Sequence, residues 1–307
     1  MSYAGYYFCR KVFGIVKTDL AKEYGFTDPE LAHIWTSFLV AYMVGQFISA
    51  AVGRQLTCRK LLLAGMATSL CATAVIGSLT HIGRDAMLGL MGFMMVNGLS
   101  QATGWPGNVG LLSKWTRRKE RGTLMAFWGT CYQIGSILAK HFAAMMLALL
   151  GIAWSFWGAS VVLFIIWVLF FFLGQDRPED VGLTPLVDEV PVDEDGNEAP
   201  VEERPFKQVI TLVVAMGAIY FCFKFIRYAL DSWAPMILAQ SFSLEGSTAG
   251  HISTTFDWVG FLGVLVGGIA SDRLFKSRRA PVIFFMTLGM CGATIGLWLA
   301  GGNSLLM

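Results

Sequence analysis

The sequence predicts an all-α, polytopic membrane protein, and its composition and hydropathy pattern support this. Apolar residues make up 55% of the 307 residues and charged residues only 14%, whereas soluble domains carry about 25% charged residues. The mean hydropathy is +0.59, and the apolar residues fall into runs of roughly 20, the length with which a helix crosses a bilayer. We therefore expect an integral multi-pass protein of the cell (inner) membrane, with an organelle membrane as the alternative.

Nine apolar runs predict nine membrane-spanning helices. They cover about residues 2–20, 31–53, 60–80, 86–111, 123–148, 152–174, 207–230, 247–271 and 280–300. Gly104 and Pro106 are expected to kink the fourth span. Lys and Arg gather in the loops after the second, fourth and eighth spans, so these loops and the start of the chain are expected on the cytoplasmic side.

One segment, residues 175–206, has a different composition from the rest. It holds eleven of the 21 acidic residues and five of the nine prolines, which is typical of a solvated linker. The predicted organisation is therefore a six-helix N-terminal half at 1–174, an acidic cytoplasmic linker at 175–206, and an incomplete C-terminal half of about three helices at 207–307.

An internal repeat relates the two halves. Ala50-x-x-Gly53-Arg54-Gln55 recurs as Gly268-x-x-Ser271-Asp272-Arg273, at an offset of 218 residues. The same offset carries Arg10 of the first span to within one residue of Arg227 in the seventh. A cation within a membrane helix is costly and usually faces a bundle interior or a water-filled path. Arg10 and Arg227 are therefore predicted to occupy equivalent places between the halves.

Several motifs together resemble one transporter family. They are Tyr6-Tyr7-x-x-Arg10-Lys11, Asn97-Gly98-x-x-Gln101-x-x-Gly104-Trp105-Pro106, Lys114-Trp115 before Glu120-Arg121-Gly122, Arg177-Pro178-Glu179-Asp180-Val181-Gly182-Leu183, Arg227-Tyr228 before Trp233-x-Pro235, and Ser271-Asp272-Arg273. The set resembles the organophosphate:phosphate antiporter family of the major facilitator superfamily, which includes glycerol-3-phosphate and hexose-6-phosphate transporters. The resemblance implies the major facilitator fold, with two pseudo-symmetric halves and about nine of twelve spans present.

The resemblance also implies a binding site for phosphate. In the family the arginines of these motifs bind the phosphate group, which assigns that role to Arg10 and Arg227. A guanidinium suits it because it stays charged when buried and offers a planar fork to phosphate oxygens. Tyr3, Tyr7 and Tyr132 would donate hydroxyl hydrogen bonds, with Tyr7 the better candidate because it stands one turn before Arg10. The alternative, above all for Tyr3, is packing, the commoner role of aromatic residues in a span. The alternative is that the arginines form simple ion pairs, since Asp231 lies four residues after Arg227.

Further charged and polar residues of the spans belong to this hypothesis. Lys224 would add a third cation to the site or else pair with Asp231 or Asp257. Asp257 resembles the helix-eight acid that exchanges salt bridges with site cations in the family. Two positions depart from the family pattern: Tyr132 stands where a histidine is usual, and Gln46 where a lysine is common.

Other polar residues of the spans have less specific expectations. Lys140 would either replace at the site the cation missing from the second span or, as the preferred alternative, reach the outer interface. Lys11 has no assignment. Asn97, Gln101 and Trp105 share one face of the fourth span, where they would bind the organic part of a substrate or, more commonly, hydrogen-bond between helices.

The repeated loop motif predicts a conformational latch on the cytoplasmic side. In the superfamily the Asp-Arg pair of this motif makes charge contacts that hold that side closed. The resemblance assigns the role to Asp272 and Arg273 in the second copy. The first copy has Arg54 where aspartate is usual, so the latch there is expected either to be weaker or to use another acid, such as Glu120.

The sequence thus predicts a secondary active transporter that exchanges a phosphorylated small metabolite for inorganic phosphate by alternating access. The alternatives are a membrane sensor of hexose phosphate that signals to a partner kinase, and a truncated, non-transporting homologue. An enzyme is not expected, because the sequence has no phosphate-binding loop, nucleophile–base pair or metal-ligand cluster, and its six cysteines show no CxxC spacing. No cofactor, metal or nucleic acid is expected.

Overall fold

A computed structural model describes residues 1–117, 124–125, 127–184, 205–275 and 279–300. The chain packs as two units, Met1–Thr255 and Phe256–Met307. Within the described ranges every regular element is a helix, which agrees with the predicted all-α class. Most of the predicted linker, residues 185–204, lies outside the described residues.

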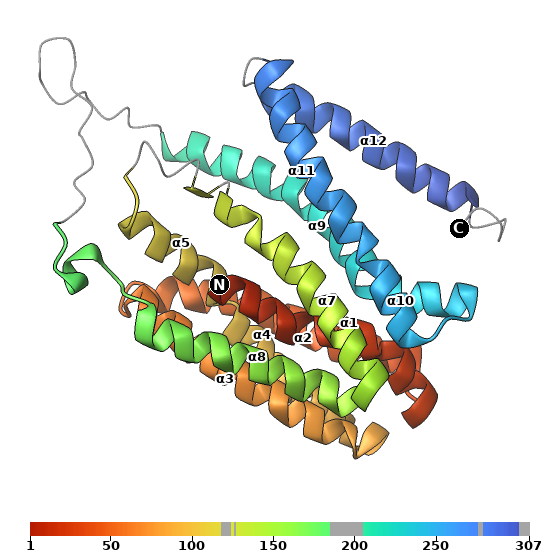
Figure 1. Ribbon diagram of the computed structural model, residues 1–307. Coiled ribbons are helices and arrows are strands. Elements are labelled where there is room, and N and C mark those ends of the chain that lie inside the picture. The colour runs from red at the N-terminus through yellow and green to blue at the C-terminus, as the bar shows by residue number, and fades with distance from the viewer. Residues whose placement is uncertain (118–123, 126, 185–204, 276–278, 301–307) are drawn as a thin grey trace, which may run out of the picture. The chain divides into compact units, whose positions relative to one another are not determined.

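The first unit contains most of the helices (Figure 1). They are α1 (Ser2–Tyr24), α2 (Asp28–Val52), α3 (Cys58–Thr80), α4 (Met87–Gln101), α5 (Gly104–Lys114), α7 (Cys131–Leu150), α8 (Ile152–Leu173), α9 (Phe206–Phe242) and α10 (Gly246–Ser253), with short 3₁₀ turns η1 (Gly83–Ala86) and η2 (Pro178–Val181). The last two helices are α11 (Thr255–Arg273) and α12 (Arg279–Ala300). Five of the described helices are long and apolar enough to cross a membrane.

Local signals in the sequence fix the tight connection between α1 and α2. Gly25 adopts a left-handed conformation (φ 68°) that ends α1, and its N–H donates to the Ala21 carbonyl. Thr27 and Glu30 then form a capping box that starts α2, with the Thr27 N–H 2.9 Å from Glu30 Oε2. The two helices are therefore joined by only three residues.

Three predicted spans differ in detail from the observed helices. The fourth is interrupted at Ala102 and Thr103, between α4 and α5, directly before the glycine and proline that predict a kink. The eighth is interrupted at Thr254, between α10 and α11. The seventh is longer than the prediction, because α9 runs for 37 residues and continues through Pro235.

Helix α1 is the packing centre of the first unit. It contacts α7, α8 and α9, while α2 packs on α4, and α3 packs on α4 and α8; Figure 1 shows α1, α7 and α8 running side by side. At the α1–α7 crossing the helices touch closely, since a methyl group on Gly135 would lie 2.9 Å from the Cα of Ala4. This arrangement puts the first half of α1 beside α2, α7 and α9.

Candidate functional site

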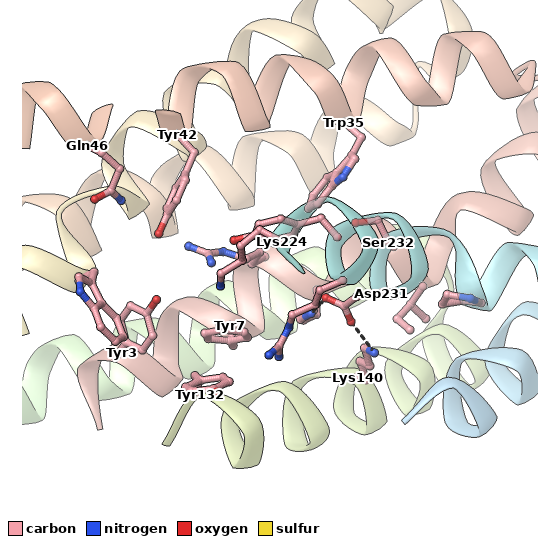
Figure 2. Close-up of a pocket in the computed structure, with 18 of the residues that line it drawn as sticks. Tyr3, Tyr7, Trp35, Tyr42, Gln46, Tyr132, Lys140, Lys224, Asp231 and Ser232 are labelled. Atoms are coloured by element: carbon pink, nitrogen blue, oxygen red, sulfur yellow. Dashed lines mark hydrogen bonds and ion pairs between the residues drawn. The ribbon is translucent and has the colours of Figure 1, made fainter. Parts of the chain in front are cut away.

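A cavity of ≈ 510 Å³ lies between α1, α2, α5, α7 and α9, wholly within the first unit. Five basic side chains and one carboxylate line it, together with a wall of aromatic rings (Figure 2). The lining residues are Tyr3, Tyr7, Arg10, Lys11, Gly14, Ile15, Trp35, Tyr42, Gln46, Trp105, Tyr132, Lys140, Tyr220, Lys224, Arg227, Tyr228, Asp231, Ser232 and Pro235.

The structure brings most of the predicted substrate-binding residues together here. Seven of the eight line this cavity: Tyr3, Tyr7, Arg10, Gln46, Tyr132, Lys224 and Arg227. They come from four helices and are separated by up to 224 residues in sequence. The eighth, Asp257, belongs to the second unit, so its role at the site stays a prediction.

Arg10 is buried, with 5% of its surface exposed, and is held by neutral groups. Its Nε donates to Gln101 Oε1 at 2.9 Å. Its guanidinium carbon lies 4.6 Å from the centre of the Tyr42 ring and 5.2 Å from that of Tyr7, distances at which cation–π attraction operates. Among the described residues no carboxylate lies within ion-pair distance of Arg10.

Arg227 faces the same cavity from α9. Its guanidinium carbon lies 5.2 Å from the centre of the Tyr132 ring. The alternative interpretation is an Arg227–Asp231 ion pair. The described part of the chain has no such pair, and the two oxygens of Asp231 instead pair with Lys11 and Lys140. Two arginines from α1 and α9 thus meet one cavity with their charges open to a ligand.

The preferred expectation for Lys140, the outer interface, is wrong, and the residue lines the cavity instead. Only 1% of its surface is exposed, and its Nζ lies 2.7 Å from Asp231 Oδ1, as the dashed line in Figure 2 shows. Lys11, which had no assignment, pairs with the other oxygen of Asp231. Lys140 stays inside because a buried carboxylate attracts it more strongly than the distant interface can, and the result is a three-helix ion cluster of α1, α7 and α9.

Lys224 does not pair with Asp231 in the described structure, and its alternative pairing with Asp257 stays a prediction. Its Nζ lies 5.1 Å from the Tyr220 ring centre and 5.5 Å from that of Tyr228, and it faces the cavity. This placement agrees with a third cation at the site. Gln46, on α2, donates its amide to the carbonyl of Ala102 at 3.2 Å, where the fourth span is interrupted.

The residues on the polar face of the fourth span have two different roles, hydrogen bonding between helices and lining of the cavity. Asn97 and Gln101 are buried and hydrogen-bonded to other helices, Asn97 to Ser69 of α3 and Gln101 to Ser69 and to Arg10 of α1, as the commoner of the two interpretations expects. Trp105 instead lines the cavity, with its ring 5.6 Å from that of Tyr3. Tyr3 is accordingly packed among rings, since Tyr7 and Trp128 lie 5.7 and 5.5 Å away.

Sequence reasoning missed two parts of this cavity. Tyr42 is the ring nearest to Arg10, and it stands one helical turn before Gln46, a spacing that could have identified it. The Lys11–Asp231 contact joins residues 220 positions apart, so no local signal could have revealed it.

The predicted conformational latch lies largely outside the described residues. Glu120 is not described, and neither are the side chains of Asp272 and Arg273, although both belong to the last turn of α11. Arg54 is exposed in the turn after α2. The latch therefore stays a prediction.

Comparison with known proteins identifies the family. The profile of the Major Facilitator Superfamily matches residues 1–307. "Sugar phosphate exchanger 3" of Bos taurus is 31% identical over 288 residues, covering 85% of this chain and 58% of that protein. "Glycerol-3-phosphate transporter" of Bacillus subtilis is 29% identical over 324 residues, covering 99% of this chain and 70% of that protein. The chain therefore spans 58% to 70% of the length of these two relatives.

A solved structure supports the same fold. A bacterial homologue of the human lysosomal transporter Spinster, in an inward-facing and unoccupied conformation, aligns with a TM-score of 0.70 and 13% identity, over 90% of this chain and 62% of that one. Since five described helices are also long and apolar enough to span a bilayer, the chain is a multi-pass membrane protein. It belongs to the Major Facilitator Superfamily, and its relatives confirm the resemblance to the organophosphate antiporter family within that superfamily.

Proposed function

We propose that this chain forms the substrate-binding part of a secondary transporter that exchanges a phosphorylated small metabolite, of the sugar phosphate or glycerol-3-phosphate class, for inorganic phosphate. The observation that carries the proposal is the pair Arg10 and Arg227. Both face one cavity, and among the described residues neither has a carboxylate within ion-pair distance. The printed names of the relatives, a sugar phosphate exchanger and a glycerol-3-phosphate transporter, agree with it.

The charge of the cavity suits a phosphate dianion. Five basic groups face one carboxylate, and that carboxylate is already shared by Lys11 and Lys140. The remaining cations, Arg10, Lys224 and Arg227, surround the rest of the space. Phosphate oxygens would accept charge-assisted hydrogen bonds from the two guanidinium groups, and the hydroxyls of Tyr7 and Tyr132 would add neutral donors.

The same charges favour exchange over leak. An empty cavity leaves its arginines without a counter-charge, and burying unpaired charges is costly. The helices around an empty site should therefore resist the closure that alternating access requires, whereas a bound phosphate or phosphate ester neutralises the site. Either anion would satisfy this condition, which accounts for exchange of one for the other.

Phosphate binding tests the site. We expect the purified chain in detergent to bind inorganic phosphate, with competition by glycerol-3-phosphate and glucose 6-phosphate. Arg10→Ala should weaken phosphate binding by about 100-fold or more, because a charge-assisted bidentate contact is lost. The matched control is Arg84→Ala, since Arg84 is exposed and pairs with Glu30 away from the cavity. Undiminished phosphate binding in Arg10→Ala would contradict the site assignment.

Proteoliposomes test the exchange. Uptake of labelled sugar phosphate should require phosphate inside the vesicles. Equal uptake with and without internal phosphate would exclude obligatory exchange, and binding without any transport would favour the sensor alternative.

A further inference from the structure

Gln101, at the end of α4, is the one hydrogen-bonding side chain that the described structure gives to Arg10. None of its surface is exposed. Its Oε1 accepts from Arg10 Nε at 2.9 Å, and Nε is the guanidinium nitrogen nearest the side-chain stem. The bond to Gln101 therefore does not occupy the terminal nitrogens of Arg10, a residue that lines the cavity, and Nη2 is buried without a protein hydrogen-bond partner among the described residues.

A buried network fixes which way the Gln101 amide points. Its Nε2 donates to Asn97 Oδ1 at 2.9 Å and approaches Ser69 Oγ at 3.3 Å. Ser69 Oγ in turn donates to Asn97 Oδ1 at 2.7 Å. Because both donors of the amide face oxygen atoms of α3 and α4, its carbonyl oxygen must face Arg10. The orientation of Arg10 on α1 is therefore set by side chains of α3 and α4.

The acceptor is neutral, and this matters for the charge of the site. A carboxylate at the same place would also orient Arg10, but it would neutralise the guanidinium and compete with a ligand anion for it. An amide oxygen holds the side chain and leaves its full positive charge to the cavity. The ring faces of Tyr42, Tyr7 and Phe38, at 4.6, 5.2 and 5.8 Å, likewise attract the cation without cancelling its charge.

We propose that Gln101 is a positioning residue that aims Arg10 at the ligand phosphate while keeping its charge free, and that Asn97 and Ser69 fix the amide for this task. The inference rests on the proposed function, since it assumes that Arg10 binds the phosphate. It adds a specificity rule: the side chain beside Arg10 Nε has to be an uncharged acceptor for the site to hold a dianion.

The decisive variant is Gln101→Glu, which keeps the shape of the side chain but replaces the uncharged acceptor with a carboxylate. At pH 7.5 it should bind inorganic phosphate about 10- to 100-fold more weakly than the wild type, because the guanidinium becomes internally paired. As the pH falls and the introduced carboxyl is protonated, its affinity relative to the wild type at the same pH should recover. Gln101→Leu removes the acceptor without adding charge, and should weaken phosphate binding about 3- to 10-fold at every pH.

Gln133→Glu is the matched control. Gln133 is buried in α7, with 3% of its surface exposed, and does not line the cavity. This control also places a carboxyl in the bundle interior, so it reports general destabilisation, and we expect it to leave phosphate affinity within about threefold of the wild type.

The variants separate the positioning role of Gln101 from the proposed function. If Arg10→Ala abolishes phosphate binding while Gln101→Glu binds as the wild type does, the positioning role is wrong and the proposed function stands. The positioning role is also wrong if Gln101→Glu is impaired equally at all pH values, or if Gln133→Glu loses as much affinity. If Arg10→Ala retains phosphate binding, the proposed function fails and this inference fails with it.

Discussion

Arg10 and Lys11 are neighbours on α1, and both line the same cavity, yet their surroundings are opposite in kind. Arg10 is held by an amide oxygen and aromatic rings. Lys11 is held by the carboxylate of Asp231, which also binds Lys140. At one end of the cavity the charge of Arg10 is not neutralised by a carboxylate. At the other end the charges of Lys11, Lys140 and Asp231 are paired and join α1, α7 and α9. Neighbouring cations of one helix therefore serve ligand binding and structure separately.

The largest expected effect comes from removing the acid of the ion cluster. Asp231→Asn would leave two buried lysines facing each other, and breaking a buried ion pair in this way costs about 3–5 kcal/mol of the free energy of unfolding. Thermal unfolding in detergent measures it. Asp85→Asn, at an exposed aspartate of the η1 turn, is the control and should stay within about 0.5 kcal/mol of the wild type. A similar loss in both variants would remove the structural role assigned to the cluster.

Arg10→Lys tests the other end of the cavity. The charge stays, but the planar fork is lost, so phosphate affinity should fall about 10- to 100-fold in a binding assay. Lys11→Met is the matched variant one residue away, and it should change phosphate affinity by less than about threefold, because Lys11 is engaged by Asp231. If Lys11→Met weakens phosphate binding as much as Arg10→Lys does, the two cations do not differ in function.

The sequence predicts the role of Arg10 but not that of Lys11. The reason is that the partner of Lys11 is far away in the sequence and on another helix. The repeat brings Arg10 and Arg227 into correspondence by a fixed offset, and the polar face of the fourth span contains Gln101 at helical spacing from Asn97. The partner of Lys11 lies 220 residues away on another helix, and the partner of Lys140 lies on that same distant helix. Such pairings depend on how helices pack, which no local pattern encodes.

The helices likewise have features that local sequence predicts and features that depend on packing. Their existence follows from apolar runs of membrane length, and the start of α2 follows from the Thr27–Glu30 capping box. The interruption at Thr254 was not predictable, since neither glycine nor proline stands at that position. Nor was the continuation of α9 through Pro235, where packing on α1 and α10 overrides the tendency of proline to end a helix.

Lys140→Met separates the two lysines of the ion cluster. Asp231 keeps Lys11, and the apolar replacement fills a similar volume, so the free energy of unfolding should fall by only about 1 kcal/mol, the net value of one polar interaction. Phosphate affinity should stay within about threefold. Chemical denaturation and the binding assay measure the two quantities. A loss as large as that of Asp231→Asn would mean that Lys140 alone, rather than the shared carboxylate, holds α7 to α9.

The smallest effect is expected at a second Asp–Lys pair, which lies outside the membrane-spanning helices. Asp176 follows α8, and its Oδ2 lies 2.5 Å from Lys114 Nζ at the end of α5, while its Oδ1 accepts from the backbone N–H of Arg59 at 3.1 Å. Burial raises the pKa of Asp176, but the hydrogen bonds from Lys114 and Arg59 and the charges of Lys114 and Arg177 outweigh it, so the pKa lies below its ordinary value of 3.8.

A lowered pKa fixes the direction of the pH dependence at Asp176. The pair stabilises the fold fully above the ordinary carboxyl pKa, and the stabilisation is lost as the pH falls through the lowered value. Asp176→Asn should thus lower the free energy of unfolding by about 1 kcal/mol or less at pH 7, and the gap to the wild type should narrow below about pH 4. Unfolding at both pH values checks this. A gap that does not narrow on acidification would show that hydrogen-bond geometry rather than charge holds the end of α8. A gap as large as that of Asp231→Asn would show that the greater exposure of Lys114, compared with Lys11 and Lys140, does not weaken its pair.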